Sequence, residues 1–145
     1  MQKHIFLAVL LGAAALVQAA GPSAVAPAPS HPLLGNWSWT LAKNSCTETF
    51  QYSAGEMRKG VSGEEITQSR YSVSPKPSLL GFYRVTETVT QSNAKKDCSG
   101  DLHEVSGEPV TRFIQFSPNL KQLIVCREES LKACFGPLQR QPDKG

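Results

Sequence analysis

Beyond residue 33 the chain alternates apolar and polar residues in short runs that are separated by turn residues. A period of two is typical of β-strands with one buried and one exposed face. The predicted strands span 33–40, 46–52, 57–61, 64–73, 80–91, 110–116, 122–127 and 131–135. A helical period is not sustained anywhere in this part, because glycine and proline recur too often. The pattern predicts an all-β, antiparallel up-and-down meander of seven or eight strands.

Such a meander favours a closed barrel, although a sandwich has the same strand spacing. A single antiparallel sheet would leave two edge strands unpaired, and closure removes both edges. A barrel of eight strands encloses a space that is filled by side chains or holds one small ligand. We therefore expect a small β-barrel domain over 33–140 and a disordered polar tail over 141–145. The pattern leaves open whether the interior is filled or hollow.

The amino terminus has the pattern of a secretory signal peptide over residues 1–19. A short basic start precedes an apolar run at 5–17, and small residues stand at Val17 and Ala19, where a signal peptidase requires them. Cleavage is expected after Ala19, with Ala20 as the alternative. The run is shorter than the ~20 residues that span a bilayer, so no membrane span is expected after cleavage. Residues 20–32 are rich in proline and alanine and predict an extended, disordered linker. The expected location is periplasmic or secreted.

The chain contains 4 cysteines, which suggests two disulfide bonds in an exported small domain. Three pairings are possible for four cysteines. Cys126 and Cys134 flank a predicted hairpin and would lie nearly opposite each other. That pairing leaves Cys46 with Cys98, which would tie down the long polar loop at 92–108. A zinc knuckle is disfavoured because no two cysteines have the required close spacing. Neither a metal nor another cofactor is expected.

The first predicted strand contains both tryptophans, and Gly35, Trp37 and Trp39 share one of its faces. Leu34-Gly35-Asn36-Trp37 at the start of an exported meander resembles the opening of the calycin superfamily, which includes the lipocalins and the avidins. The resemblance implies a barrel floor in which Gly35 lets the backbone pass closely and Trp37 is the plug. Small periplasmic protease-inhibitor barrels of Gram-negative bacteria begin in a similar way.

The chain also departs from these families. The Thr-Asp-Tyr motif of lipocalins is not found, and there is no room for their carboxy-terminal helix. Avidins line their biotin site with tryptophans from later strands, whereas no tryptophan follows Trp39. Biotin binding is therefore not expected.

Three charged residues fall on strand faces that are otherwise apolar, namely Glu48, Glu87 and Arg112. A charge that faces the interior is costly unless it is paired, so we expect Arg112 to pair with Glu48 or Glu87. One interpretation is a structural ion pair, or a strand whose open end lets these groups reach water. The other is a polar anchor at the base of a pocket for an otherwise apolar ligand. The candidate interior ligand-binding residues are Trp39, Glu48, Tyr52, Tyr71, Glu87 and Arg112.

Other functions find less support in the sequence. The net charge is only +3, and no basic stripe with interleaved aromatics is present, so nucleic-acid binding is not expected. The Gly-x-Ser-x-Gly motif is absent, and Asp101, His103 and Glu104 lie in a loop without partners at metal-ligand spacing. We therefore predict a non-enzymatic binding module for a small apolar ligand. The alternative is a protein-binding module, such as an inhibitor of an extracytoplasmic enzyme.

Overall fold

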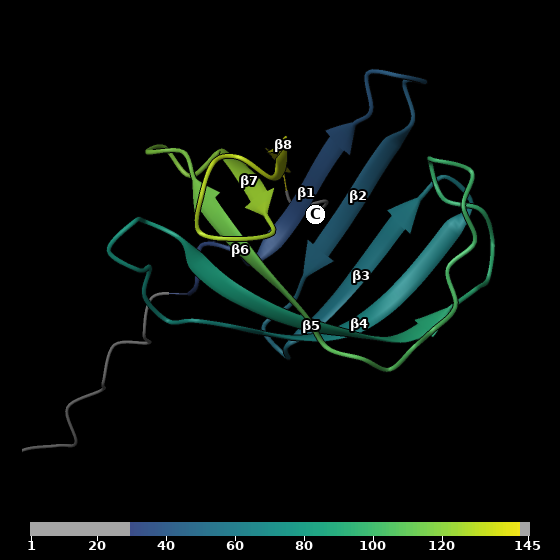
Figure 1. Ribbon diagram of the computed structural model, residues 1–145, viewed down its shortest axis with the longest axis horizontal. Helices are drawn as coiled ribbons and strands as arrows, with labels where there is room; N and C mark the ends of the chain where they lie inside the picture. Colours follow the sequence, from purple (N-terminus) through teal and green to yellow (C-terminus); the bar gives the residue numbers. More distant parts are fainter. Residues whose placement is uncertain (1–29, 143–145) are drawn as a thin grey trace, which may run out of the picture.

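The computed structural model describes residues 30–142 (Figure 1). The predicted signal peptide lies outside this range, as does most of the predicted linker. The strands are β1 Gly35–Thr40, β2 Thr47–Tyr52, β3 Met57–Ser62, β4 Glu65–Val73, β5 Tyr83–Ser92, β6 Val110–Phe116, β7 Gln122–Cys126 and β8 Cys134–Gln141. Helices are absent from the described residues, none of which could therefore form a membrane-spanning helix. The all-β prediction is confirmed.

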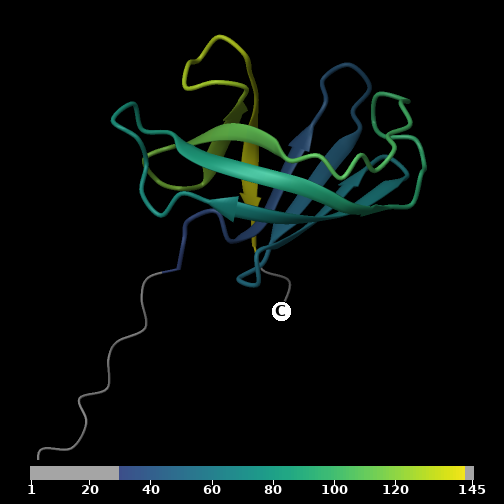
Figure 2. The ribbon, with the colours of Figure 1, turned by 60° about the horizontal axis from the view of Figure 1, so that its bottom comes forward.

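Every strand pairs in antiparallel fashion with the next along the chain, and β1 also pairs with β8. The last pairing sets Trp37 opposite Arg140 and Ser38 opposite Gln139, and it closes the barrel. Figure 2 shows β8 descending beside β1 to complete the wall. No strand edge among residues 30–142 is left without a neighbour, which is the physical advantage of closure over an open sheet.

The prediction for the last strand was wrong. A strand at 131–135 that ends before Gly136-Pro137 was expected, but β8 runs through this dipeptide and ends at Gln141. The register explains how, since Phe135 pairs with Val125 and Leu138 pairs with Leu123. Two residues of β8 therefore stand opposite one residue of β7, which is a β-bulge. A bulge tolerates a proline, which has no N–H for the ladder, and Gly136 adopts a positive φ of 117° there.

The hydrophobic core gathers at one end of the barrel. Its buried members come from the beginnings of odd-numbered strands and the ends of even-numbered strands, and in an antiparallel barrel these meet at the same end. We call this the closed end, and the opposite end the open end. The buried core residues are Leu33, Trp37, Tyr71, Val85, Ile114, Leu123 and Leu138.

Trp37 is the centre of the closed end. It is fully buried, and its indole Nε1 donates a hydrogen bond of 2.9 Å to the carbonyl of Leu33. The guanidinium of Arg140, from β8, lies 4.2 Å over the indole ring. Gly35, two residues before Trp37, has a φ of 113°, a backbone conformation that residues with a Cβ rarely adopt. Together these residues cover the floor of the barrel.

The structure pairs Cys46 with Cys98 and Cys126 with Cys134, so the predicted pairing is confirmed. The first bond joins the start of β2 to the loop between β5 and β6. The second bridges the facing ends of β7 and β8, where Cys126 and Cys134 stand opposite each other in register. Two disulfide bonds in a small domain are consistent with an oxidising, extracytoplasmic location.

Candidate ligand-binding site

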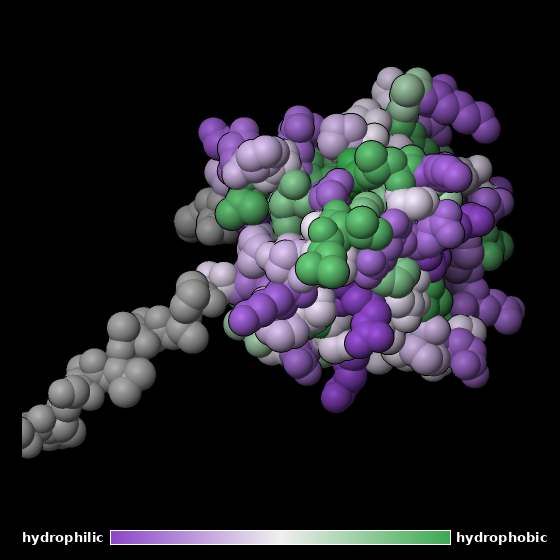
Figure 3. Space-filling model, turned by 60° about the vertical axis from the view of Figure 1, so that its left-hand side comes forward, coloured by the Kyte–Doolittle hydropathy of each residue, from purple (hydrophilic) through white to green (hydrophobic). Residues whose placement is uncertain are grey.

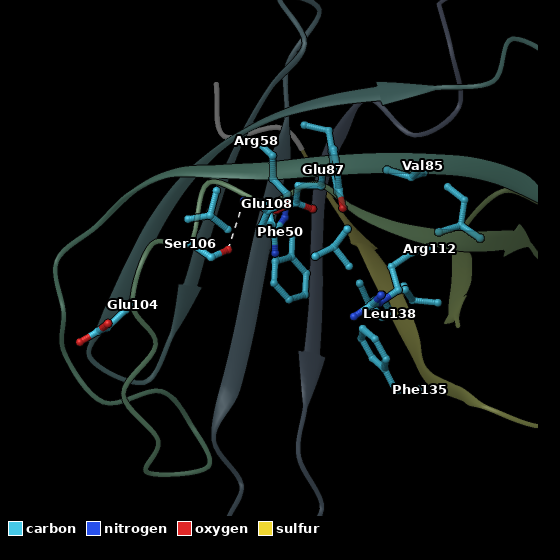
Figure 4. A pocket seen from close by; sticks show the side chains of 15 residues that line it. Phe50, Arg58, Val85, Glu87, Glu104, Ser106, Glu108, Arg112, Phe135 and Leu138 are labelled. Carbon is cyan, nitrogen blue, oxygen red and sulfur yellow. Dashed lines mark hydrogen bonds and ion pairs between the residues drawn. The ribbon is translucent and has the colours of Figure 1, made fainter. Parts of the chain in front are cut away.

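The barrel is partly hollow. A cavity of about 320 Å³ is lined by side chains of six strands and of the β5–β6 loop (Figure 4). Most of this lining is apolar, as expected for a small-molecule pocket. The apolar lining residues are Phe50, Tyr52, Val85, Val89, Val110, Ile114, Val125, Phe135 and Leu138.

A second cavity of about 430 Å³ lies toward the open end and has a more polar lining, which includes Glu48, Ser62 and Glu65. Both cavities are bordered by Phe50, Arg58, Val89, Glu104 and Arg112. This shared border makes them two parts of one interior space. The part formed by the first cavity is apolar. The part formed by the second cavity lies toward the open end, is polar and is bordered by the β5–β6 loop.

The ion pair inside the barrel joins Arg58 of β3 to Glu87 of β5. The sequence predicted Arg112 as the partner of Glu87 or Glu48, and that prediction was wrong. Strand β4 lies between β3 and β5, and it places the buried Ser69 directly opposite Arg58. The small Ser69 side chain leaves the space in which Arg58 and Glu87 meet across β4. The guanidinium of Arg58 also lies 4.5 Å over the ring of Phe50.

Arg58 was not among the predicted site residues, although a signal for it exists. Strand alternation places Arg58, Gly60 and Ser62 on the same face, and Gly60 pairs with Phe50, which faces the cavity. An arginine next to a glycine on an inner face has room to extend along the wall. The Nε atom of Arg58 is buried and has no hydrogen-bond partner in the part of the chain that the structure describes. It is therefore an available donor inside the barrel.

Arg112 lines both cavities without an ionic partner. Its Nη1 donates a hydrogen bond of 3.0 Å to the adjacent carbonyl of Thr111. No carboxylate among residues 30–142 lies within ion-pair distance of it. Figure 4 shows its side chain beside Phe135 and Leu138, across the cavity from Glu87. The result is a half-buried guanidinium that faces an apolar space with its charge uncompensated.

Glu48 and Trp39 pair across β1 and β2 near the open end. Glu48 lines the second cavity, and its Oε1 accepts a hydrogen bond of 2.6 Å from the Ser62 hydroxyl. Trp39 borders neither of these two cavities and packs on Phe135 instead, with ring centroids 5.2 Å apart. The structure thus brings Glu48 into the predicted interior and places Trp39 in the packing around it.

The two predicted tyrosines pack edge to face, with ring centroids 5.0 Å apart. Tyr52 lines the first cavity, and burial raises its pKa to about 12. Tyr71 lies beneath it in the core, and its hydroxyl donates a hydrogen bond of 2.9 Å to the carbonyl of Ser53. Burial raises the pKa of Tyr71 as well. Both phenols therefore stay neutral at physiological pH, and neither adds a charge to the cavity.

The β5–β6 loop contributes Glu104, Ser106 and Glu108 to the lining of the first cavity, and the sequence did not predict this role. The loop is held at the open end by the Cys46–Cys98 bond and by a hydrogen bond of 2.6 Å from Asn44 Nδ2 to the carbonyl of Cys98. The sequence predicted the Cys46–Cys98 bond by elimination, whereas the contact of Asn44 with Cys98 joins residues too far apart for a local pattern to indicate it.

Fold and site together define a class, which is a small, disulfide-bonded, closed β-barrel with an apolar cavity that contains arginine. No protein-family model, curated protein or solved structure matches the chain.

Proposed function

We propose that the protein is an exported, non-enzymatic binding module that holds a small, largely apolar molecule with one acidic group in a lipocalin-like barrel. The uncompensated guanidinium of Arg112 at the border of the two cavities carries this proposal. The combined interior space is of the size that accommodates small molecules, for which pockets measure roughly 300–1,000 Å³.

The charges around the cavity favour an anion as the polar group. Glu87 is compensated by Arg58, whereas Glu104 and Glu108 are exposed on the loop and reach water. Arg112 is half-buried and is left without a carboxylate, and a charge that is partly removed from water without a partner is unfavourable. A ligand carboxylate would satisfy this side chain through two parallel N–H···O bonds, which is the geometry that guanidinium groups favour. The apolar walls would hold the rest of the ligand.

The experiment compares an acidic probe with its neutral counterpart. A dansyl-labelled fatty acid and its methyl ester are titrated into the folded protein, and dansyl fluorescence reports binding. In the wild type the acid binds more tightly than the ester. Arg112→Met lowers the affinity for the acid by roughly tenfold, which corresponds to the loss of one charge-assisted hydrogen bond. It leaves the affinity for the ester unchanged.

Arg84→Met is the matched control, because Arg84 is exposed and pairs with no residue of the cavity lining. It leaves both affinities unchanged. Equal binding of acid and ester by the wild type would contradict the proposal, as would loss of acid binding in the control.

A second candidate function is protein binding, as in an inhibitor of an extracytoplasmic enzyme. It is favoured by Leu79 and Leu80, two exposed residues of the β4–β5 loop. Figure 3 shows apolar side chains that gather on one face of the molecule among polar ones. Native mass spectrometry of protein purified from its source distinguishes the two functions. A bound small molecule supports the first, and a stoichiometric protein partner that Leu79→Ser and Leu80→Ser release supports the second.

A further inference from the structure

A cluster of potential metal ligands lies at the open end, where the β5–β6 loop meets the start of β4. Asp97, Asp101 and His103 each offer one ligand atom, and these atoms all lie within 4.8 Å of one another. Nδ1 of His103 is 3.7 Å from Oδ2 of Asp97. Acids and a histidine on a loop are common without any ligand, so this cluster alone carries no conclusion.

The independent observation is Glu65, at the start of β4. This residue is only 8% exposed, and its buried Oε1 has no hydrogen-bond partner among residues 30–142. That oxygen is aimed at the cluster, because it lies 3.8 Å from Nδ1 of His103. A buried carboxylate oxygen without a donor is unfavourable, and a bound cation would satisfy it.

Backbone contacts hold the two parts of the cluster together. The carbonyl of Lys96 accepts hydrogen bonds from the backbone N–H groups of Glu64 and Glu65, at 3.0 and 3.1 Å. The adjacent Asp97 is oriented by its own contacts, since its Oδ1 accepts hydrogen bonds from the backbone N–H groups of Ser99 and Asp101. These bonds leave Oδ2 of Asp97 facing His103. Supporting hydrogen bonds of this kind orient the ligands in metal sites.

We propose that Glu65, Asp97 and His103, with Asp101 as the fourth donor, bind one divalent transition-metal ion such as Zn²⁺. Tetrahedral zinc with bonds of about 2.0–2.1 Å sets neighbouring ligand atoms roughly 3.4 Å apart. The separations of 3.7 and 3.8 Å around His103 Nδ1 exceed this value by about 0.4 Å or less. The ligand atoms of Asp97, Asp101 and His103 lie within 4.8 Å of one another, so the side chains would have to move inward to close on an ion. The imidazole selects zinc or a similar ion, because Ca²⁺ and Mg²⁺ take oxygen ligands.

The ion would lie at the mouth of the interior space, since Glu65, Asp97 and His103 all border the second cavity. The sequence predicted no metal site because Asp101 and His103 lacked partners at a defined spacing. The missing partner is Glu65, which lies on β4 and not on the β5–β6 loop. This proposal stands independently of the proposed small-molecule ligand.

The experiment is a calorimetric titration of the full chain, oxidised and without an affinity tag, with Zn²⁺ near neutral pH. One ion binds per chain. His103→Ala and Glu65→Gln each weaken the affinity by roughly tenfold or more, as expected for the loss of a ligand. Glu108→Gln is the matched control, because it removes a carboxylate from the same loop outside the cluster. It changes the affinity by less than about twofold. Ca²⁺ binds more weakly than Zn²⁺.

His103 is a safe site for substitution because its side chain is 59% exposed, so His103→Ala carries the test even if Glu65→Gln does not fold. Near-ultraviolet circular dichroism verifies the fold of each variant. A second measurement follows the imidazole resonances of His103 by NMR, which shift when Zn²⁺ is added to the wild type. The absence of saturable Zn²⁺ binding overturns the proposal. Unchanged affinity in His103→Ala also overturns it, as does loss of binding in His31→Ala with His103 intact.

Discussion

The arginine at the closed end of the barrel and the arginine toward its open end differ in their contacts. At the closed end, Arg140 lies over the Trp37 ring and donates hydrogen bonds to the carbonyls of Leu34, Pro32 and Leu120. Toward the open end, Arg112 faces a cavity, and within residues 30–142 its one hydrogen bond goes to the neighbouring carbonyl of Thr111. Because hydrogen-bonded groups stabilise a fold, the contacts of Arg140 stabilise the closed end. The charge of Arg112 is left uncompensated toward the open end.

The tryptophans offer the largest test of this comparison. Trp37→Ala removes a fully buried side chain from the closed end and lowers the free energy of unfolding by about 3–5 kcal/mol. Trp39→Ala costs less, because Trp39 is only half-buried. Urea denaturation measures both values. An equal or larger loss for Trp39→Ala would contradict the assignment of the closed end as the stability centre.

Removal of the Cys46–Cys98 bond tests the open end. The double substitution Cys46→Ala and Cys98→Ala lowers the free energy of unfolding by about 2–4 kcal/mol. Amide hydrogen exchange then rises in the β5–β6 loop and remains slow around Trp37, because the bond ties only the loop to β2. The matched control is the double substitution Cys126→Ala and Cys134→Ala, which leaves exchange in the β5–β6 loop unchanged. Uniformly faster exchange in the first variant would show that the two ends are not separate.

The same substitution at the two arginines compares the ends directly. Arg140→Met lowers the free energy of unfolding by about 2 kcal/mol, because it removes charge-assisted hydrogen bonds to backbone carbonyls. Arg112→Met changes it by less than about 0.5 kcal/mol. Both values come from denaturation in the absence of ligand. A destabilised Arg112→Met variant would indicate that Arg112 stabilises the fold and is not held ready for a ligand.

The smallest expected effect is a dependence of stability on alkaline pH. Burial raises the pKa of Tyr52 to about 12, above the ordinary value of 10. The folded state therefore holds this proton more tightly, so the stabilisation is complete below pH 10 and is lost as the pH rises toward 12. The loss reaches about 1 kcal/mol near pH 11. Denaturation curves measured at several pH values show a smaller dependence for Tyr52→Phe than for the wild type. Identical pH profiles of the two proteins would contradict this prediction.

The hairpin between Cys126 and Cys134 predicted one disulfide bond, and the second followed by elimination. Strand alternation in the sequence predicted the fold and the inner faces, because both depend on local periodicity. It failed at β8, where a bulge opposite β7 carries the strand through Gly136-Pro137. A bulge is set by the partner strand, so a local rule that reads glycine and proline as a stop cannot detect it.

The candidate site was predictable to a similar extent. Alternation placed Glu48, Tyr52, Glu87 and Arg112 on inner faces, and all four line the interior space. The pairing of charges was not predictable, because the partner of Glu87 is decided by the small Ser69 on the strand between them. Apart from the Cys46–Cys98 bond, the contacts of the long loop were not predictable for a similar reason, since they depend on three-dimensional closure.

Formation of the disulfide bond at the open end depends on the compartment in which the chain folds. Cys98 is only 6% exposed, and thiol–disulfide exchange requires a thiolate to reach a sulfur atom. Once the Cys46–Cys98 bond has formed, attack at Cys98 is therefore slow, and the half-buried Cys46 is the more accessible of the two sulfurs. A chain that never met an oxidant lacks the tie that holds the loop across the mouth. Two molecules of identical sequence can thus differ in how firmly the β5–β6 loop is held, according to the compartment in which each one folded.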